Sequence, residues 1–255
     1  MTVVQTPRAH DFANMWRVLK GSIRQYLARR LELPEIPVAL ERMARLGLTP
    51  RLIFDVGAYR GDFARLCLSL WPDAKVACFE AQEGVLPELD RMAASEPGIT
   101  VIRTLLGSER CQEVALHEAR MASSVLREKA GPRHPANLYK MTTVDDIVET
   151  VFSGATPNIL KIDVQGYELE VLKGAAASLA SVDVILAEIS LLDLHEEVPL
   201  LADIVGWLER RSFVAYDICG LTRRPLDRAL WQCDMLFVPA GSRFRQDKRW
   251  NIGTT

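Results

Sequence analysis

The stretch LIFDVGAYRGDFARL, residues 52–66, contains the features that decide the fold. It begins as an apolar strand, and Asp55 stands close to the end of that strand. Gly57 and Gly61 then frame a short loop, which leads into a segment with helical spacing of apolar residues. Glycine lacks a Cβ and therefore suits a sharp turn or a close approach to a ligand. The stretch predicts the first strand, loop and helix of an open α/β sheet, where cofactors usually bind.

Strand and helix patterns alternate along the rest of the chain. Further strands are predicted at 75–80, 99–103, 158–164, 183–189, 213–218 and 233–239, and helices at 38–46, 84–94, 143–152, 167–179 and 198–208. Strands that alternate with helices indicate a mostly parallel sheet with crossover helices. The sequence therefore predicts an α/β fold.

The chain divides into three regions. We expect an N-terminal helical extension at 1–50, a main domain at 51–240 and an exposed basic tail at 241–255. Residues 104–142 interrupt the alternation, and their short runs predict an antiparallel insert or an extra edge hairpin. Residues 12–31 form a basic amphipathic pattern, which favours a helix packed on the domain; peripheral contact with a membrane surface is the alternative.

Composition excludes several classes of protein. The 255 residues carry a formal net charge of −2, so no general attraction to nucleic acid is expected. The five cysteines are scattered without a CxxC pair, which is typical of buried thiols in a reducing compartment. No apolar run is long enough for a membrane span, and the first residues do not resemble a signal peptide. We expect a cytoplasmic location.

Three cofactors compete for the loop at 55–61. A triphosphate-binding loop needs a lysine after its second glycine, and this loop has none. A dinucleotide fingerprint needs a third glycine, and Asp55 would repel a pyrophosphate. The same carboxylate suits S-adenosylmethionine, which is cationic and has no phosphate. Glu80, at the end of the second strand, can accept hydrogen bonds from the ribose hydroxyls of this cofactor. NAD sites also use such an acid, so the loop rather than Glu80 favours S-adenosylmethionine.

A second polar stretch is ILKIDVQGYELEVLKGA, residues 159–175. Its strand ends at Asp163, which we expect beside the first strand, facing the methyl group and the acceptor together with Gln165. Lys161 interrupts the apolar strand and either faces an edge or needs a partner, because an unpaired buried lysine is costly. Glu188 ends the following strand, so four neighbouring strands end in or near acids.

These motifs resemble the FkbM-type family of S-adenosylmethionine-dependent methyltransferases. The segments FDVGAYRGDFA, ACFEAQ, TTVDDI, LKIDVQGYELEVLKGA, ILAEIS and DMLFV carry the resemblance, in the family's order, over about 51–239. It implies a Rossmann-like class I methyltransferase fold, with a mostly parallel seven-stranded sheet, helices on both faces and an antiparallel end strand. It also implies methylation of a hydroxyl on a sugar, glycan, glycolipid or natural product.

The resemblance assigns residues to parts of the site. The implied cofactor-binding residues are Asp55, Gly57, Ala58, Tyr59 and Gly61 at the methionine end, Glu80 and Ala81 at the ribose, Gly107 and Ser108 at the adenine, and Asp163 at the reacting centre. Three positions depart from the family pattern, which commonly has Asn at Tyr59, Pro at Ala81 and Glu at Gln165.

A hydroxyl acceptor benefits from a general base. Asp163 is the first candidate and His195 the second, and Gln165 contributes at least positioning. Asp163, Glu188 and Asp193 lack tight ligand spacing, so no metal is predicted. Basic residues of the insert indicate a solvated face or, alternatively, contact with an anionic acceptor. A catalytically inactive binding module and an NAD-dependent oxidoreductase remain the alternatives.

Overall fold

The computed structural model describes residues 23, 26–117, 123–130 and 134–251. Its described part contains a seven-stranded sheet of order β3-β2-β1-β7-β8-β10-β9. The strands are β1 (Leu52–Val56), β2 (Lys75–Phe79), β3 (Ile99–Ile102), β7 (Ile159–Ile162), β8 (Val184–Ser190), β9 (Phe213–Arg223) and β10 (Leu230–Pro239). Among these seven strands, β10 pairs antiparallel with both of its neighbours, β8 and β9. All other pairings in this sheet are parallel. The antiparallel strand is thus the last in sequence and the second from the edge.

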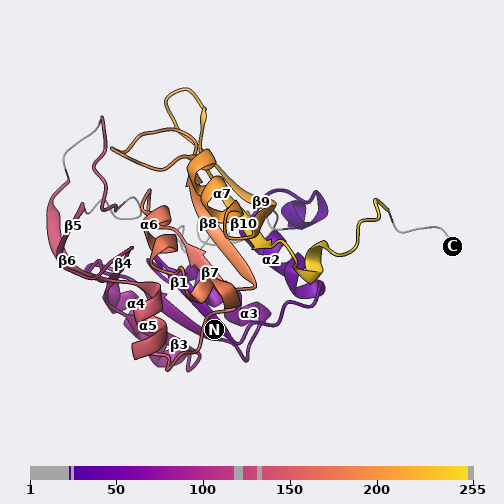
Figure 1. Cartoon of the computed structure of the whole chain (residues 1–255), viewed down its shortest axis with the longest axis horizontal. Helices are drawn as coiled ribbons and strands as arrows, with labels where there is room; N and C mark the ends of the chain where they lie inside the picture. Colours follow the sequence, from indigo (N-terminus) through magenta and orange to yellow (C-terminus); the bar gives the residue numbers. More distant parts are fainter. Residues whose placement is uncertain (1–22, 24–25, 118–122, 131–133, 252–255) are drawn as a thin grey trace, which may run out of the picture.

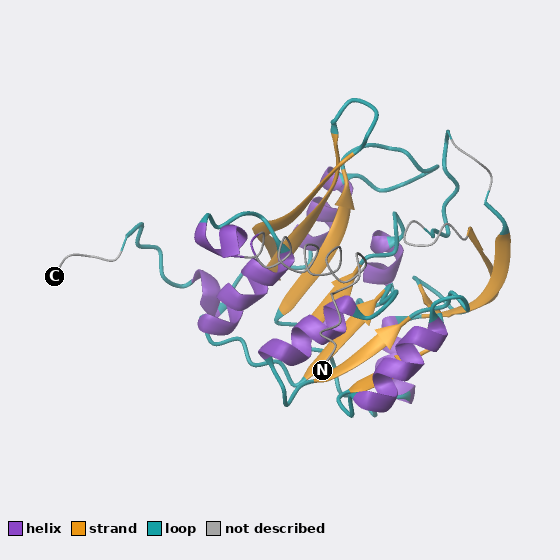
Figure 2. Ribbon diagram, turned by 180° about the vertical axis from the view of Figure 1, so that it is seen from behind, coloured by secondary structure: helices purple, strands orange, loops and turns teal. Residues whose placement is uncertain are grey.

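Helices cover both faces of the sheet (Figures 1 and 2). The helices are α2 (Ile36–Arg45), α3 (Asp62–Leu70), α4 (Leu86–Ser95), α5 (Val144–Thr150), α6 (Glu168–Lys173) and α7 (Leu201–Glu209). Alternate residues of β1 face opposite sides of the sheet, so Phe54 packs with α5, α6 and α7, whereas Ile53 packs with α2, α3 and α4. The predicted Rossmann-like arrangement is confirmed.

Residues 105–142 include a second, smaller sheet beside the main one. Its strands are β4 (Leu105–Leu106), β5 (Cys111–His117) and β6 (Ala136–Thr142), in the order β4-β6-β5. The β5 and β6 strands pair antiparallel, and β4 pairs parallel with β6. This insert emerges next to the carboxyl end of β3 and so lies beside the ends of the parallel strands (Figure 1).

Residues near both ends of the described chain make contacts, whereas residues 246–251 are exposed and extend away from the sheet (Figure 1). Arg29 donates to Glu41 of α2, and Phe244 lies 6.3 Å from the ring of Tyr216, between ring centroids. The first part of the tail is therefore less exposed than predicted. Most of the basic pattern at 12–31 lies outside the described residues, and the three-region division stays a prediction. No helix in the described part is both long and apolar enough to cross a membrane.

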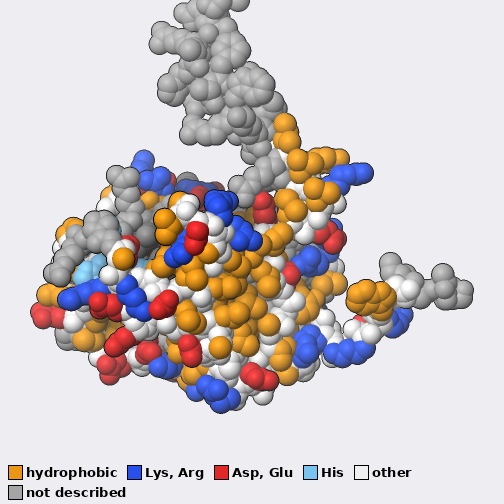
Figure 3. Space-filling view, turned by 90° about the horizontal axis from the view of Figure 1, so that it is seen from above, with side chains coloured by type: hydrophobic (Ala, Val, Ile, Leu, Met, Phe, Trp, Pro, Cys, Tyr) orange, Lys and Arg blue, Asp and Glu red, His pale blue; other side chains and the backbone are white. Residues whose placement is uncertain are grey.

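The face seen in Figure 3 carries a broad area of apolar side chains bordered by acidic and basic ones. Ile218 and Leu221 of β9 are about half exposed, which leaves apolar side chains accessible along this edge strand.

Candidate active site

A cavity of about 320 Å³ opens at the carboxyl ends of the parallel strands. This volume lies within the roughly 300–1,000 Å³ typical of ligand sites. Its lining includes Val56, Gly57, Tyr59, Phe79, Glu80, Ala81, Gln82, Thr104, Leu105, Leu106, Leu116, Ser123, Val125, Asp163, Val164, Gln165, Tyr167, Glu188, Thr222, Trp231 and Gln232. The chain leaves β1 toward β2 on one side and later returns to β7 on the other, so the cavity straddles the point where strand order reverses. Ligands of open α/β sheets bind at this position.

Glu80 is fixed at the end of β2 by three backbone groups. Its Oε1 accepts from the N–H groups of Ala81 (2.8 Å) and Gln82 (2.9 Å), and its Oε2 accepts from that of Tyr59 (2.9 Å). Burial raises the pKa of Glu80, while these three donors oppose the rise. A carboxylate has about four acceptor sites, so one remains for a ligand hydroxyl. The predicted ribose acid is therefore rigid and lines the cavity.

The two predicted glycines serve different contacts. Gly57 lines the cavity with φ +75°, and a Cβ built there would lie 1.9 Å from the carbonyl oxygen of Asp163. Gly61 has φ +78°, and its Cβ would lie 2.2 Å from Met92 of α4, away from the cavity lining. Both glycines are needed because protein groups approach the backbone, rather than because a ligand does.

Asp55 forms a buried ion pair with Lys161. The Lys161 Nζ lies 2.9 Å from Asp55 Oδ1 and donates to the carbonyl oxygen of Gly57 at 2.8 Å. Burial would lower the pKa of Lys161, but Asp55 and then Asp163 raise it overall, so the lysine is cationic. Asp55, which was predicted at the methionine end of the cofactor, is fully buried and does not line the cavity. Its charge neutralises Lys161, because a buried cation needs a partner.

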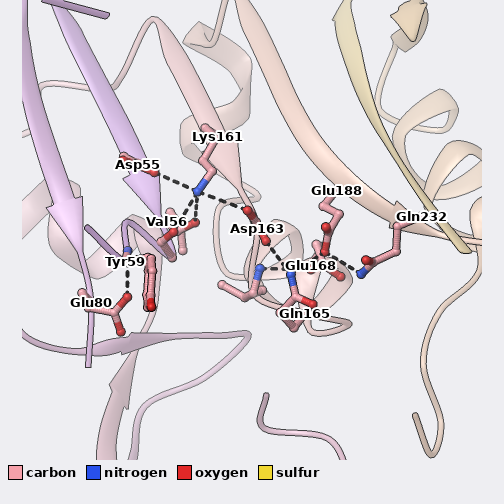
Figure 4. Close-up of polar contacts among 12 residues, drawn as sticks. Asp55, Val56, Tyr59, Glu80, Lys161, Asp163, Gln165, Glu168, Glu188 and Gln232 are labelled. Carbon is pink, nitrogen blue, oxygen red and sulfur yellow. Dashed lines mark hydrogen bonds and ion pairs between the residues drawn. The ribbon is translucent and has the colours of Figure 1, made fainter. Parts of the chain in front are cut away.

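Two carboxylates and two amides meet at the reacting end of the cavity (Figure 4). Gln165 Nε2 donates to Asp163 Oδ1 at 2.9 Å and to Glu188 Oε2 at 2.8 Å. Gln232 Nε2 donates to the same Glu188 oxygen at 2.6 Å. Burial, followed by the neighbouring Asp163, raises the pKa of Glu188 well above its ordinary value. The amide nitrogen of Gln165 therefore bridges the two carboxyl groups, at a position where the family pattern commonly has a glutamate.

A strained turn positions Gln165. Gln165 and Gly166 have φ of +56° and +105°, in the left-handed region. Glu168, at the start of α6, accepts from the N–H groups of Val164 (3.1 Å) and Gly166 (3.0 Å), which fixes the turn. Burial raises the pKa of Glu168 to about 7 against these backbone donors. Glu168 is thus a buried support for the site rather than part of its surface.

His195 does not occupy the place predicted for a second base. Its side chain is 3% exposed, it is absent from the cavity lining, and a Cβ at Gly166 would lie 3.8 Å from its Nδ1. Burial lowers the pKa of His195, with Glu128 opposing. His195 therefore packs beneath the turn at Gln165 and Gly166.

Some of the other predicted residues line the cavity and some do not. Tyr59, Ala81 and Gln165 line the cavity together with Gly57, Glu80 and Asp163. Ala58, Gly107 and Ser108 do not, and a Cβ on Gly107 would meet Met141 Sδ at 2.4 Å. The described residues contain no cluster of metal-ligand type, and Asp193 pairs with Lys129 at 2.6 Å outside the cavity.

Sequence reasoning missed the wall formed by Thr222, Trp231 and Gln232. These residues lie in parts of β9 and β10 that extend beyond the predicted strands 213–218 and 233–239. Gly220 concealed the continuation, because glycine is uncommon in strand interiors. A Cβ there would lie 1.8 Å from Asp234 Oδ2, so the glycine admits a neighbouring side chain without ending the strand.

The sheet order, the helices on both faces and the cavity at the strand ends define a class I, Rossmann-like methyltransferase fold. The family model described as "Methyltransferase FkbM domain" matches residues 55–215. The chain therefore belongs to the FkbM methyltransferase family. Membership makes S-adenosylmethionine, the methyl donor that the sequence motifs imply, its cofactor.

Relatives of this chain include a curated sugar-modifying enzyme. The hexuronic acid methyltransferase AglP of Haloferax volcanii is 30% identical over 141 residues, which span 54% of this chain and 55% of AglP. The chain thus matches about half the length of this relative.

Two solved structures illustrate the likeness in fold. An FkbM methyltransferase from Methylobacillus flagellatus KT superposes with a TM-score of 0.50 at 18% identity, covering 74% of this chain and 43% of that one. The 1,6-didemethyltoxoflavin-N1-methyltransferase of Burkholderia thailandensis, solved with S-adenosylhomocysteine, has a TM-score of 0.46 at 13% identity and covers 93% of each chain. At these identities the likeness concerns the fold alone.

Proposed function

We propose that this protein is an O-methyltransferase that transfers the methyl group of S-adenosylmethionine to a hydroxyl of a sugar or sugar-containing acceptor. The observation that carries the proposal is one cavity with the fixed carboxylate of Glu80 at one end and the Asp163–Glu188 pair at the other. The similarity to AglP, which is named for hexuronic acid, supports a sugar acceptor.

The cavity residues suit the cofactor in three ways. Glu80 offers a fixed acceptor for a ribose hydroxyl. Phe79, Leu105 and Leu106 offer apolar surface for the adenine ring. Gly57 lines the cavity, so its backbone can contact the methionine end. The bound cofactor supplies a methyl group on a positively charged sulfur, which is the chemically reactive part.

The protein's own contribution is alignment and proton transfer. Holding the acceptor oxygen in line with the methyl carbon can supply roughly 7–11 kcal/mol of the barrier. As the carbon–oxygen bond forms and the carbon–sulfur bond breaks, the hydroxyl proton passes to the Asp163–Glu188 pair. Asp163 is the proposed base, because it lines the cavity and Gln165 orients it. His195 has no such role in this proposal, because it is buried and does not line the cavity.

The proposal is tested by incubating the protein with methyl-labelled S-adenosylmethionine and a panel of glycosides, and locating the label in the products. Label on a sugar hydroxyl is expected. The rate of label transfer should be at least about 100-fold lower in Asp163→Asn, since general-base catalysis contributes 10²–10⁴-fold. Cofactor binding without transfer to any acceptor would favour the inactive binding module. The family match already disfavours the NAD-dependent oxidoreductase.

A further inference from the structure

The cavity lining spans several strands of the sheet. Its lining includes Glu80 after β2 and Gln232 on β10, which are four strand spacings apart in the sheet. At ~4.8 Å per spacing these strands are about 19 Å apart. Glu188, Thr222, Trp231 and Gln232 form the part farthest from Glu80, called here the hairpin end. The proposed function places the cofactor at Glu80, which leaves the hairpin end for the acceptor.

The hairpin end presents hydrogen-bond acceptors. Both amide donors, from Gln165 and Gln232, converge on Oε2 of Glu188. Within the described chain no group donates to Oε1 of Glu188 or to Oε1 of Gln232. The orientation of the Gln232 amide follows from its neighbour, because a carboxylate oxygen needs a donor. A ligand that satisfies these two oxygens must itself carry donors, such as hydroxyl groups.

The charged side chains near the hairpin end also bear on the kind of ligand it can bind. Lys161, the cation beside Asp163, is already committed to Asp55 and to the carbonyl oxygen of Gly57. Three basic side chains around the insert have acidic partners: Arg103 with Asp90 (2.8 Å), Arg110 with Asp146 (2.5 Å) and Lys129 with Asp193 (2.6 Å). An anionic group on the acceptor would approach the carboxylate of Asp163, and like charges at close range are unfavourable.

We propose that the hairpin end binds an uncharged, hydroxyl-bearing ring such as a neutral sugar unit, with Glu188 and Gln232 accepting hydrogen bonds from its hydroxyls. Trp231 lines the same end of the cavity, and its buried Nε1, which has no partner within the described chain, is a donor for a ring or hydroxyl oxygen. This specificity rests on the proposed function and differs from that of AglP, which is named for an acidic sugar.

Saturation-transfer NMR of the full chain with saturating S-adenosylhomocysteine tests the proposal. The probes are methyl β-D-glucopyranoside, which is neutral, and methyl β-D-glucuronide, which is anionic, each titrated at millimolar concentration. Glu188→Gln replaces the carboxyl group with an amide of nearly the same shape. Asp193→Asn is the matched control, because it makes the same carboxyl-to-amide change at an exposed position outside the cavity.

The neutral glycoside should bind at least about fivefold more tightly than the glucuronide, since only the latter meets like charge. Glu188→Gln should weaken neutral binding about fivefold, because the amide oxygen must receive the two glutamine donors and an amide nitrogen then replaces Oε1 as the group that faces the ligand. Asp193→Asn should change neither. If Glu188→Gln does not fold, Thr222→Val on the same wall should weaken neutral binding instead.

Tighter binding of the glucuronide, or equal effects of the two variants, would overturn the proposal. So would failure of both probes to bind while S-adenosylhomocysteine binds. If S-adenosylhomocysteine itself does not bind to the wild-type protein, the proposed function fails, and with it the assignment of the hairpin end.

Discussion

Lys161 and Asp55 lie opposite each other on the neighbouring strands β7 and β1, and their charged groups are 2.9 Å apart. The Lys161 side chain is 9% exposed and that of Asp55 is fully buried. Lys161 also donates to the carbonyl oxygen of Gly57 and lies 3.7 Å from Asp163 Oδ2. This lysine therefore connects the cofactor loop to the reacting end of the cavity.

Replacing Lys161 with methionine should destabilise the protein strongly. The change leaves the Asp55 carboxylate buried without a partner, which costs about 3–5 kcal/mol. Urea denaturation measures the loss in the free energy of unfolding. The double variant Lys161→Met, Asp55→Asn should recover part of it. Lys129→Met is the control, since its pair with Asp193 is exposed and screened by solvent and should contribute little to stability. Equal losses in the two single variants would contradict the buried pair.

Glu168 should make stability depend on pH. Its pKa is raised to about 7 in the folded protein from an ordinary value of 4.5, so the folded state holds the proton more tightly. The resulting stabilisation is complete below pH 4.5 and is lost as pH rises through about 7. Relative to Glu168→Gln, wild-type unfolding free energy should fall by on the order of 3 kcal/mol across this interval.

Denaturation of both proteins at several pH values between 4.5 and 8 checks this prediction. Glu170→Gln is the comparison, because the pKa of Glu170 is lowered, with Lys173 and Ser108 outweighing burial. The difference between wild type and Glu170→Gln should be flat over the same range. A flat difference for Glu168→Gln as well would show that Glu168 titrates normally in the folded state.

Gly57 should not tolerate alanine. Its positive φ and the approach of the Asp163 carbonyl oxygen leave no room for a Cβ, so Gly57→Ala should cost at least about 2 kcal/mol and weaken cofactor binding. Gly84→Ala is a suitable control, because nothing lies within 4 Å of a Cβ there. Thermal unfolding of the two variants should separate them clearly. Similar melting temperatures would contradict the close approach.

Much of the fold could be read from local patterns. The buried strands of the parallel sheet are short apolar runs that end in polar residues, as at Asp163, and these patterns do not depend on distant partners. The lengths of β9 and β10 could not be read, because Gly220 and the charged turn that follows it are typical of a loop. Cross-strand pairing extends these strands to Arg223 and Leu230.

The site was predictable where a residue's role follows from its place at a strand end. Glu80 and Asp163 line the cavity for that reason. The partner of Asp55 was not predictable, because Lys161 lies 106 positions away and only strand register brings the two together. The same holds for Gln232, whose contact with Glu188 depends on the antiparallel pairing of β10 with β8.

The central claim is that Glu80 and its neighbours hold S-adenosylmethionine, and calorimetric titration with S-adenosylhomocysteine tests it most directly. Wild-type protein should bind at micromolar concentration, and Glu80→Gln should bind at least about tenfold more weakly, because hydrogen bonds to a charged acceptor contribute roughly 1.5–3 kcal/mol. Glu83→Gln, an exposed acid outside the cavity, should bind as wild type does. Equal affinities for all three proteins, or no binding by the wild type, would contradict the account.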